Sequence, residues 1–201
     1  MKRIAVAFGF SLFFMMPSWL MAQGYHRNHG EIGVYADYLH FAPGNYDNNF
    51  VGVGGRVAFN VHPNIALEAE MNYDFARNFT TPFNNGVTTA FVKTKVRPLT
   101  GLFGPKFQIG TSSAFRAFVE GKVGFIDFST SNNAQEVTGG TFTAAIGGIG
   151  GGGTHLAVFP GGGIEGFWGW FGLRLDVGDE IYMADGANNN LRVTFGPAIR
   201  F

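Results

Sequence analysis

The chain has 201 residues with 14 basic and 14 acidic side chains, so it lacks the basic footprint of a protein that binds nucleic acid. It contains no cysteine, which excludes a disulfide framework, a thiolate metal site and a lipoprotein anchor. Its 31 glycines and 23 phenylalanines are unusual for a soluble α/β enzyme of this size. This composition favours β structure with small residues crowded on one face and aromatic residues on the other.

The first residues have the pattern of a secretory signal peptide. Lys2 and Arg3 are followed by an uncharged apolar run over 4–16, and Ala22 supplies a small residue before the cleavage site. The apolar run is shorter than the ~20 residues that a transmembrane helix needs. We therefore expect residues 1–22 to be a signal peptide that is removed on export, and residues 23–201 to form one β-barrel domain.

From residue 31 onward the dominant signal is an alternation of apolar and polar residues with a period of two, which predicts strands with two different faces. In the segment 65–75, for example, Ile65 and Leu67 alternate with Ala66 and Glu68. Most such segments have the length of about 9–12 residues that a tilted strand needs to cross a bilayer. The predicted strands are 30–41, 50–61, 65–75, 91–109, 114–128, 154–165, 171–182 and 191–201. They predict an all-β fold, an eight-stranded antiparallel up-and-down transmembrane β-barrel.

The predicted connections alternate between short and long. The tight ones are 62–64, 110–113 and 166–170, and the mostly longer ones, rich in Asn, Gly and Thr, are 42–49, 76–90, 129–153 and 183–190. Short turns at one end and longer loops at the other are typical of outer-membrane barrels, in which the long loops face the outside of the cell. An even number of strands then places both termini on the periplasmic side.

Two features indicate that the apolar face points to lipid rather than into a lipocalin-like ligand cavity. The charged face is also rich in glycine, as the narrow interior of an eight-stranded barrel requires. Aromatic residues gather where two membrane interfaces are expected, at a short turn and toward the opposite strand ends. The predicted interface aromatics are Trp168, Trp170, Tyr38, Tyr73 and Tyr182.

The stretch from Leu99 through 104–107 and the ending 191–201 resemble small outer-membrane β-barrel proteins of the outer membrane protein A type. The resemblance implies a bacterial outer membrane location, contact with outer-membrane lipid, and recognition of the terminal Phe201 by the barrel-assembly machinery. Full-length members of the family carry a peptidoglycan-binding domain after the barrel. Because nothing follows Phe201 here, we expect that domain to be absent.

With the faces assigned, many charged residues point into the lumen, where each needs a partner to offset the cost of its burial. The predicted lumen charge network is Arg56, Glu68, Glu70, Lys106, Arg116, Glu120, Lys122, Glu165, Arg174, Asp176 and Arg192, with Glu31, Asp37, Asp74, Glu180 and Arg200 on the same face. By depth, the expected central cluster is Glu68, Glu70, Lys106, Glu120 and Lys122. We expect such pairs to seal the lumen and to hold the strand register. The alternative is a gate, in which the rearrangement of one pair opens a narrow ion path, as in barrels that this chain resembles.

A lipid-modifying barrel enzyme would need serine, histidine and an acid near the lipid face. His40 faces outward near an outer loop, but no serine lies at an obvious matching height on the same face. Ser129, at the outer end of its strand, is left as the one candidate partner. Because this set is incomplete, the sequence predicts no catalytic residues, no cofactor and no metal site. It favours a structural or surface-interaction role, with an extracellular ligand bound through the loops. A narrow gated pore and a lipid-modifying enzyme remain as alternatives.

One segment departs from the apolar pattern. Lys93, Lys95 and Arg97 share parity with the apolar face of the predicted strand 91–109. We expect these three residues to lie beyond the outer edge of the bilayer, unless a β-bulge changes the parity of the strand.

Overall fold

The computed structural model describes residues 29–41, 48–84, 89–109, 114–133 and 152–201, so the predicted signal peptide lies outside the described residues. The strands are β1 (Gly30–Phe41), β2 (Asn48–His62), β3 (Ile65–Asp74), β4 (Arg77–Asn84), β5 (Thr89–Ile109), β6 (Phe115–Asn133), β7 (Gly153–Trp168), β8 (Phe171–Asp179), β9 (Ile181–Met183), β10 (Ala187–Asn188) and β11 (Leu191–Arg200). No helix in the described part of the chain is long and apolar enough to cross a membrane.

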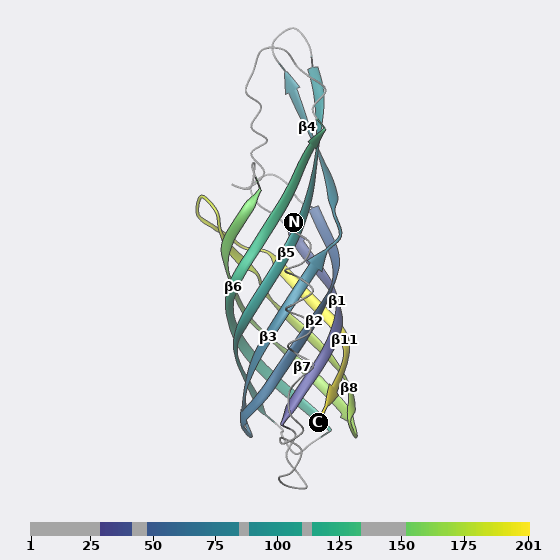
Figure 1. Cartoon of the computed structure of the whole chain (residues 1–201), viewed down its shortest axis with the longest axis vertical. Coiled ribbons are helices and arrows are strands. Elements are labelled where there is room, and N and C mark those ends of the chain that lie inside the picture. Colours follow the sequence, from purple (N-terminus) through teal and green to yellow (C-terminus); the bar gives the residue numbers. More distant parts are fainter. Residues whose placement is uncertain (1–28, 42–47, 85–88, 110–113, 134–151) are drawn as a thin grey trace, which may run out of the picture.

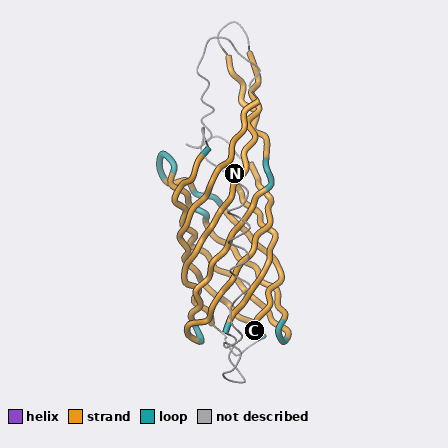
Figure 2. The backbone as a smooth tube through the Cα atoms, in the orientation of Figure 1, coloured by secondary structure: helices purple, strands orange, loops and turns teal. Residues whose placement is uncertain are grey.

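Eight of these strands close into an antiparallel barrel, in the order β1, β2, β3, β5, β6, β7, β8 and β11. The ring closes where β11 pairs with β1, from Glu31 opposite Arg200 to His40 opposite Leu191. Every other pairing in the barrel joins two barrel strands that follow one another in the chain, which is the up-and-down arrangement (Figures 1 and 2). The predicted fold class is confirmed.

The predicted loop 76–90 is wrong in part, because residues 77–84 form the strand β4. After a break at Phe75 and Ala76, β4 continues the path of β3 and pairs with β5 as far as Asn84 opposite Thr89. Aromatic and β-branched residues, which favour strands, make up most of 79–83. β6 likewise runs to Asn133, five residues past its predicted end at 128. β4, β5 and β6 therefore extend as a sheet beyond the rim of the barrel (Figure 1).

The predicted loop 183–190 also contains regular structure. β9 keeps the register of β8 against β7, and it forms a small hairpin with β10. The turn between them holds Asp185 at φ 50° and Gly186 at φ 126°, both in the left-handed region. Asp and Gly tolerate this conformation better than most residues, which explains the position of the turn.

The outside of the barrel carries the apolar side chains, and the inside carries the charged ones. Outward-facing residues such as Val34, Val119 and Ile109 are 62%, 62% and 75% exposed. At alternate positions of the same strands, charged residues such as Glu31, Lys106 and Glu120 are buried inside the barrel. This arrangement is the reverse of a lipocalin-like barrel, in which the apolar face lines the interior.

The pairing of β5 with β6 runs from Lys93 opposite Asn133 to Ile109 opposite Ala117 without a change of register. Lys95 and Arg97 therefore keep the parity of the outer face, and no bulge turns them inward. They lie beyond Leu99, which pairs with Tyr73 near the outer end of β3. A register shift does occur between β2 and β3, but it lies beside the tight turn, between Asn60 and His62.

Candidate functional site

Among the residues that the structure describes, fifteen charged side chains lie in the interior of the barrel, nine acidic and six basic, each no more than 8% exposed. They are Glu31, Asp37, Arg56, Glu68, Glu70, Asp74, Lys106, Arg116, Glu120, Lys122, Glu165, Arg174, Asp176, Glu180 and Arg192. Arg200, which was expected among them, is half-buried at the rim, where it donates a hydrogen bond to the carbonyl oxygen of Gly169 at 2.6 Å. The position of Arg200 at the end of β11 explains why it reaches the turn instead of the lumen. The ion pairs divide the fifteen residues into three layers.

The turn-side layer, nearest the tight turns, consists of Glu31, Lys106, Arg116 and Glu165. The ammonium nitrogen of Lys106 lies 2.9 Å from a Glu31 oxygen and 3.2 Å from a Glu165 oxygen. Arg116 bridges the same two carboxylates, at 2.9 Å and 3.3 Å. In this layer each of the two bases pairs with both acids, so the four charges cancel, and the contacts span the lumen.

The central layer contains three bases and three acids: Arg56, Glu68, Glu120, Lys122, Arg174 and Asp176. The guanidinium of Arg174 donates to both oxygens of Glu68, and it also reaches Glu120 at 2.8 Å. Lys122 contacts the same two glutamates, at 2.6 Å and 3.0 Å. Bidentate pairing of this kind is geometrically specific, so these contacts fix the register of the three strands β3, β6 and β8 relative to one another.

The loop-side layer surrounds a single base, Arg192. Its guanidinium lies 2.8 Å from Asp37, 2.9 Å from Glu70 and 3.1 Å from Glu180. A fourth acid, Asp74, joins the layer through the amide nitrogen of Asn72, which donates to Asp37 at 2.8 Å and to Asp74 at 3.0 Å. The acidic excess of the lumen therefore lies entirely in this layer. Glu70 links it to the central layer, because it also lies 2.7 Å from Lys122.

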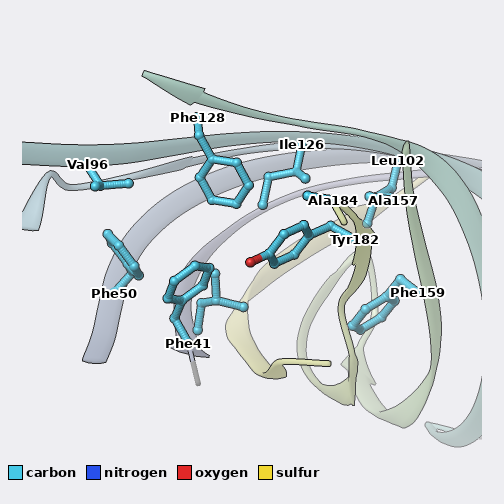
Figure 3. Close-up of a cluster of buried hydrophobic side chains, with 11 residues drawn as sticks. Phe41, Phe50, Val96, Leu102, Ile126, Phe128, Ala157, Phe159, Tyr182 and Ala184 are labelled. Atoms are coloured by element: carbon cyan, nitrogen blue, oxygen red, sulfur yellow. The ribbon is translucent and has the colours of Figure 1, made fainter. Parts of the chain in front are cut away.

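Beyond the loop-side layer the lumen is filled by an apolar plug, shown in Figure 3. Its members are Leu39, Phe41, Phe50, Val96, Leu102, Ile126, Phe128, Ala157, Phe159, Tyr182 and Ala184. The ring of Phe41 lies in its middle, with ring centroids 5.5 Å from Phe50 and 5.9 Å from each of Phe128 and Tyr182. Phe159 forms the floor of the plug, because the Lys122 and Arg192 cations lie 5.6 Å and 5.4 Å from its ring.

The plug is not evident from the alternation along any single strand. Phe50 has the inward parity of Arg56 on β2, and Phe128 has that of Glu120 on β6. The sequence feature that indicates the plug is therefore a change from charged to apolar residues on the inward face, near the loop ends of the strands. Sequence alone did not show that these strand ends meet, because they come from different hairpins.

Tyr182, expected in an interface girdle, is instead completely buried in the plug. It pairs with the buried Ala157 and shares the inward parity of Arg174 and Glu180, so its ring turns into the lumen. The other four aromatic residues lie on the outer surface: Tyr38, Tyr73, Trp168 and Trp170 are 39%, 41%, 66% and 65% exposed.

The expected central cluster is brought together except for Lys106, which belongs to the turn-side layer. Glu68, Glu70 and Glu120 all lie within 3.0 Å of the ammonium nitrogen of Lys122. Lys106 lies opposite Glu120 in the β5–β6 pairing, but its side chain turns toward Glu31 and Glu165. Backbone neighbours therefore do not identify the ion-pair partner.

Tyr35 joins the central and loop-side layers. Its ring packs under the guanidinium of Arg56 at 4.2 Å from the ring centroid, and its hydroxyl accepts a hydrogen bond from Arg192 at 3.1 Å. This arrangement depends on Gly54, because a Cβ atom there would overlap the Tyr35 ring.

We expect Gly54→Val to lower the free energy of unfolding by about 1–3 kcal/mol, since the added side chain displaces Tyr35 from between two cations. The matched control is Gly55→Val. Gly55 faces outward, and a Cβ atom there would meet nothing closer than the Gly33 carbonyl oxygen at 3.8 Å. Urea unfolding of both variants in lipid vesicles checks the difference, and equal losses would contradict this role of Gly54.

The His40–Ser129 pair considered for catalysis is not formed. His40 on β1 lies with Nδ1 2.8 Å from Oδ1 of Asn49 on β2. Ser129 on β6 is opposite Arg97, and β6 is separated from β1 by β2, β3 and β5. Within the described ranges, no group of three or more His, Cys, Asp or Glu side chains is arranged to hold a metal ion.

Neither a protein-family model nor a curated protein matches the chain. Solved structures do resemble it. The attachment invasion locus protein Ail of Yersinia pestis, in complex with the heparin analogue sucrose octasulfate, superposes with a TM-score of 0.58 at 12% identity, over 88% of this chain and 100% of Ail. A second Ail structure gives a TM-score of 0.53 at 11% identity, over 88% and 100% of the two chains.

Neisserial surface protein A has a TM-score of 0.51 at 9% identity, covering 86% of this chain and 97% of its own. At these identities the likeness establishes the fold, that of small outer-membrane β-barrels. Membership of the outer membrane protein A family stays a prediction from the sequence.

Proposed function

We propose that this protein is an integral protein of the bacterial outer membrane, closed to transport, with a structural or surface-interaction role. The observation that carries the proposal is the division of the wall into an apolar outer face and a charged interior. Exposure of that outer face to water would be unfavourable by roughly 25 cal/mol per Å² of apolar surface. A bilayer removes this penalty, and a closed barrel also leaves no strand edge unpaired in lipid.

The predicted signal peptide over residues 1–22 and the terminal Phe201 support this location. The signal peptide would direct the chain out of the cytoplasm. Phe201 would then engage the barrel-assembly machinery, as the resemblance implies. Its backbone is held in place at the rim, where its carbonyl oxygen accepts hydrogen bonds from His29 at 2.7 Å and from Gly30 at 3.0 Å.

The sealed lumen separates this proposal from the pore alternative. Three layers of ion pairs follow one another along the lumen, and the apolar plug lies beyond them. A hydrated ion would have to break pairs in each layer and then cross the plug, where nothing replaces its water. The observation that favours a gate is the position of Glu70 between Lys122 and Arg192, since it could exchange one partner for the other. The plug would still close the path.

The wild-type mature chain, refolded into a planar bilayer, is expected to show no discrete openings. A shift of the gel band on heating establishes beforehand that the chain has folded, and a large porin in the same bilayer is the positive control. Discrete openings that change in Glu70→Gln or Lys122→Gln would contradict a sealed lumen and favour the gated pore.

A surface-interaction role is supported by the sheet of β4, β5 and β6, which extends past the barrel rim on the side of the long loops (Figure 1). The structure of Ail with a heparin analogue provides a precedent for ligand binding by a barrel of this fold. In this chain an extracellular ligand would be reached first by the extended sheet, because among the described residues those of this sheet lie farthest from the bilayer.

A further inference from the structure

A basic groove lies on the outer surface of the barrel where β5 and β6 leave the wall. It has a volume of ≈ 250 Å³, and its lining includes Tyr73, Lys95, Arg97, Ser129 and Ser131. Arg97 pairs with Ser129 and Lys95 with Ser131 across the two strands, so each cation has a hydroxyl beside it. All five side chains are exposed on the outer face.

The two cations of the basic groove are not neutralised by other residues that the structure describes. Neither Lys95 nor Arg97 forms an ion pair with them. Arg97 donates to the Tyr73 hydroxyl at 3.2 Å and to Ser129 Oγ at 3.5 Å, and its guanidinium lies 5.3 Å from the Tyr73 ring centroid. Asp127, the acidic residue on the same face of β6, accepts a hydrogen bond from Thr154 at 2.7 Å. An ammonium, a guanidinium and two hydroxyls around one groove suit a phosphate group.

The position of the groove indicates which kind of phosphate it would bind. Between the groove and the tight turns, Asp127 is the only charged residue among the outward-facing residues of β5 and β6. Phe103, Val123 and Phe125 on this stretch are 53%, 51% and 38% exposed. A molecule with a phosphate in the groove could therefore lay acyl chains along the adjoining apolar wall. A soluble anion would gain only the polar contacts.

We infer that the basic groove binds a phosphate group of an outer-leaflet lipid. This inference rests on the proposed function, because it requires the apolar wall to lie in the outer membrane. The lipid would fasten the base of the extended β4–β5–β6 sheet to the membrane surface, since Lys95 and Arg97 lie where that sheet leaves the barrel.

Binding of fluorescently labelled lipid A, the phosphorylated glycolipid, to the refolded protein in detergent micelles tests the inference. We expect Lys95→Gln/Arg97→Gln to bind bis-phosphorylated lipid A about tenfold more weakly than wild type, the effect of losing charged hydrogen bonds. The matched control is Arg77→Gln, also exposed on the extended sheet but bonded to the carbonyl oxygen of Asn49 and absent from the groove. It should bind as wild type does.

Several outcomes would overturn the inference. Equal binding of dephosphorylated lipid A, or unchanged binding by the double variant, would show that the groove does not recognise phosphate. Equally tight binding of sucrose octasulfate, which has no acyl chains, would assign the groove to a soluble polyanion. In each case a protein that still inserts into vesicles and shifts on heating retains the proposed function. Failure of the wild type to insert would instead remove the proposed function itself.

Discussion

Replacing Arg174 by methionine is expected to lower the free energy of unfolding by about 3–5 kcal/mol, the range found when one partner of a buried ion pair is removed. Arg174 is the base shared by Glu68, Glu120 and Asp176, all of them buried. Without it, three carboxylates compete for the two remaining bases of the central layer. Urea unfolding in lipid vesicles, followed by tryptophan fluorescence, measures the loss.

Two further variants show whether the loss comes from the charge. Arg77→Gln removes an exposed arginine that donates a hydrogen bond to the Asn49 carbonyl oxygen at 3.1 Å, and the variant should lose less than about 1 kcal/mol. Combining Arg174→Met with Glu68→Gln removes one of the carboxylates that lost its partner Arg174, so the double variant should be more stable than Arg174→Met alone. A loss below about 1 kcal/mol in Arg174→Met would mean that water enters the central layer and solvates its carboxylates.

Phe41→Ala is expected to destabilise the protein by about 3–5 kcal/mol, the usual loss for truncating a buried phenylalanine. Phe41 is completely buried and contacts Phe50, Phe128 and Tyr182, so its removal leaves a cavity in the middle of the apolar plug. The same urea unfolding measures the loss. Hydrogen exchange should additionally show faster exchange of the amides of β9 than of those in the central part of β8.

The control for the plug is Phe41→Leu, which keeps most of the apolar volume and should cost clearly less than Phe41→Ala. Equal losses in the two variants would indicate that the aromatic ring contacts, and not the filled volume, stabilise this end of the lumen. No loss in either variant would contradict the plug as a packed part of the fold.

The strands and the direction of their faces were predictable because both follow from local alternation. Glu68 on β3 and Arg174 on β8, for instance, were placed inward from the residues on either side of them. The strand β4 was missed because the glycine- and asparagine-containing stretch 84–86 suggested a loop throughout 76–90. The structure instead makes 77–84 one arm of a hairpin with β5. Tyr182 lies near a strand end, as interface aromatics do, but its parity is that of Arg174 and Glu180, and parity decides that its ring turns into the lumen.

By itself, the sequence determined that this chain forms a closed eight-stranded barrel with charges inside and apolar residues outside. The alternation of faces with a period of two is a local property of each strand, so it does not depend on which strands lie beside it. Only the tertiary structure decided which charges meet, that Lys106 leaves the expected central cluster, and that Phe41, Phe50, Phe128 and Tyr182 close the outer end. The depth of a side chain in a barrel depends on the stagger between neighbouring strands and on their tilt. No single strand contains that information, so partners such as Glu68 and Arg174, 106 residues apart, are found only when the ring is closed.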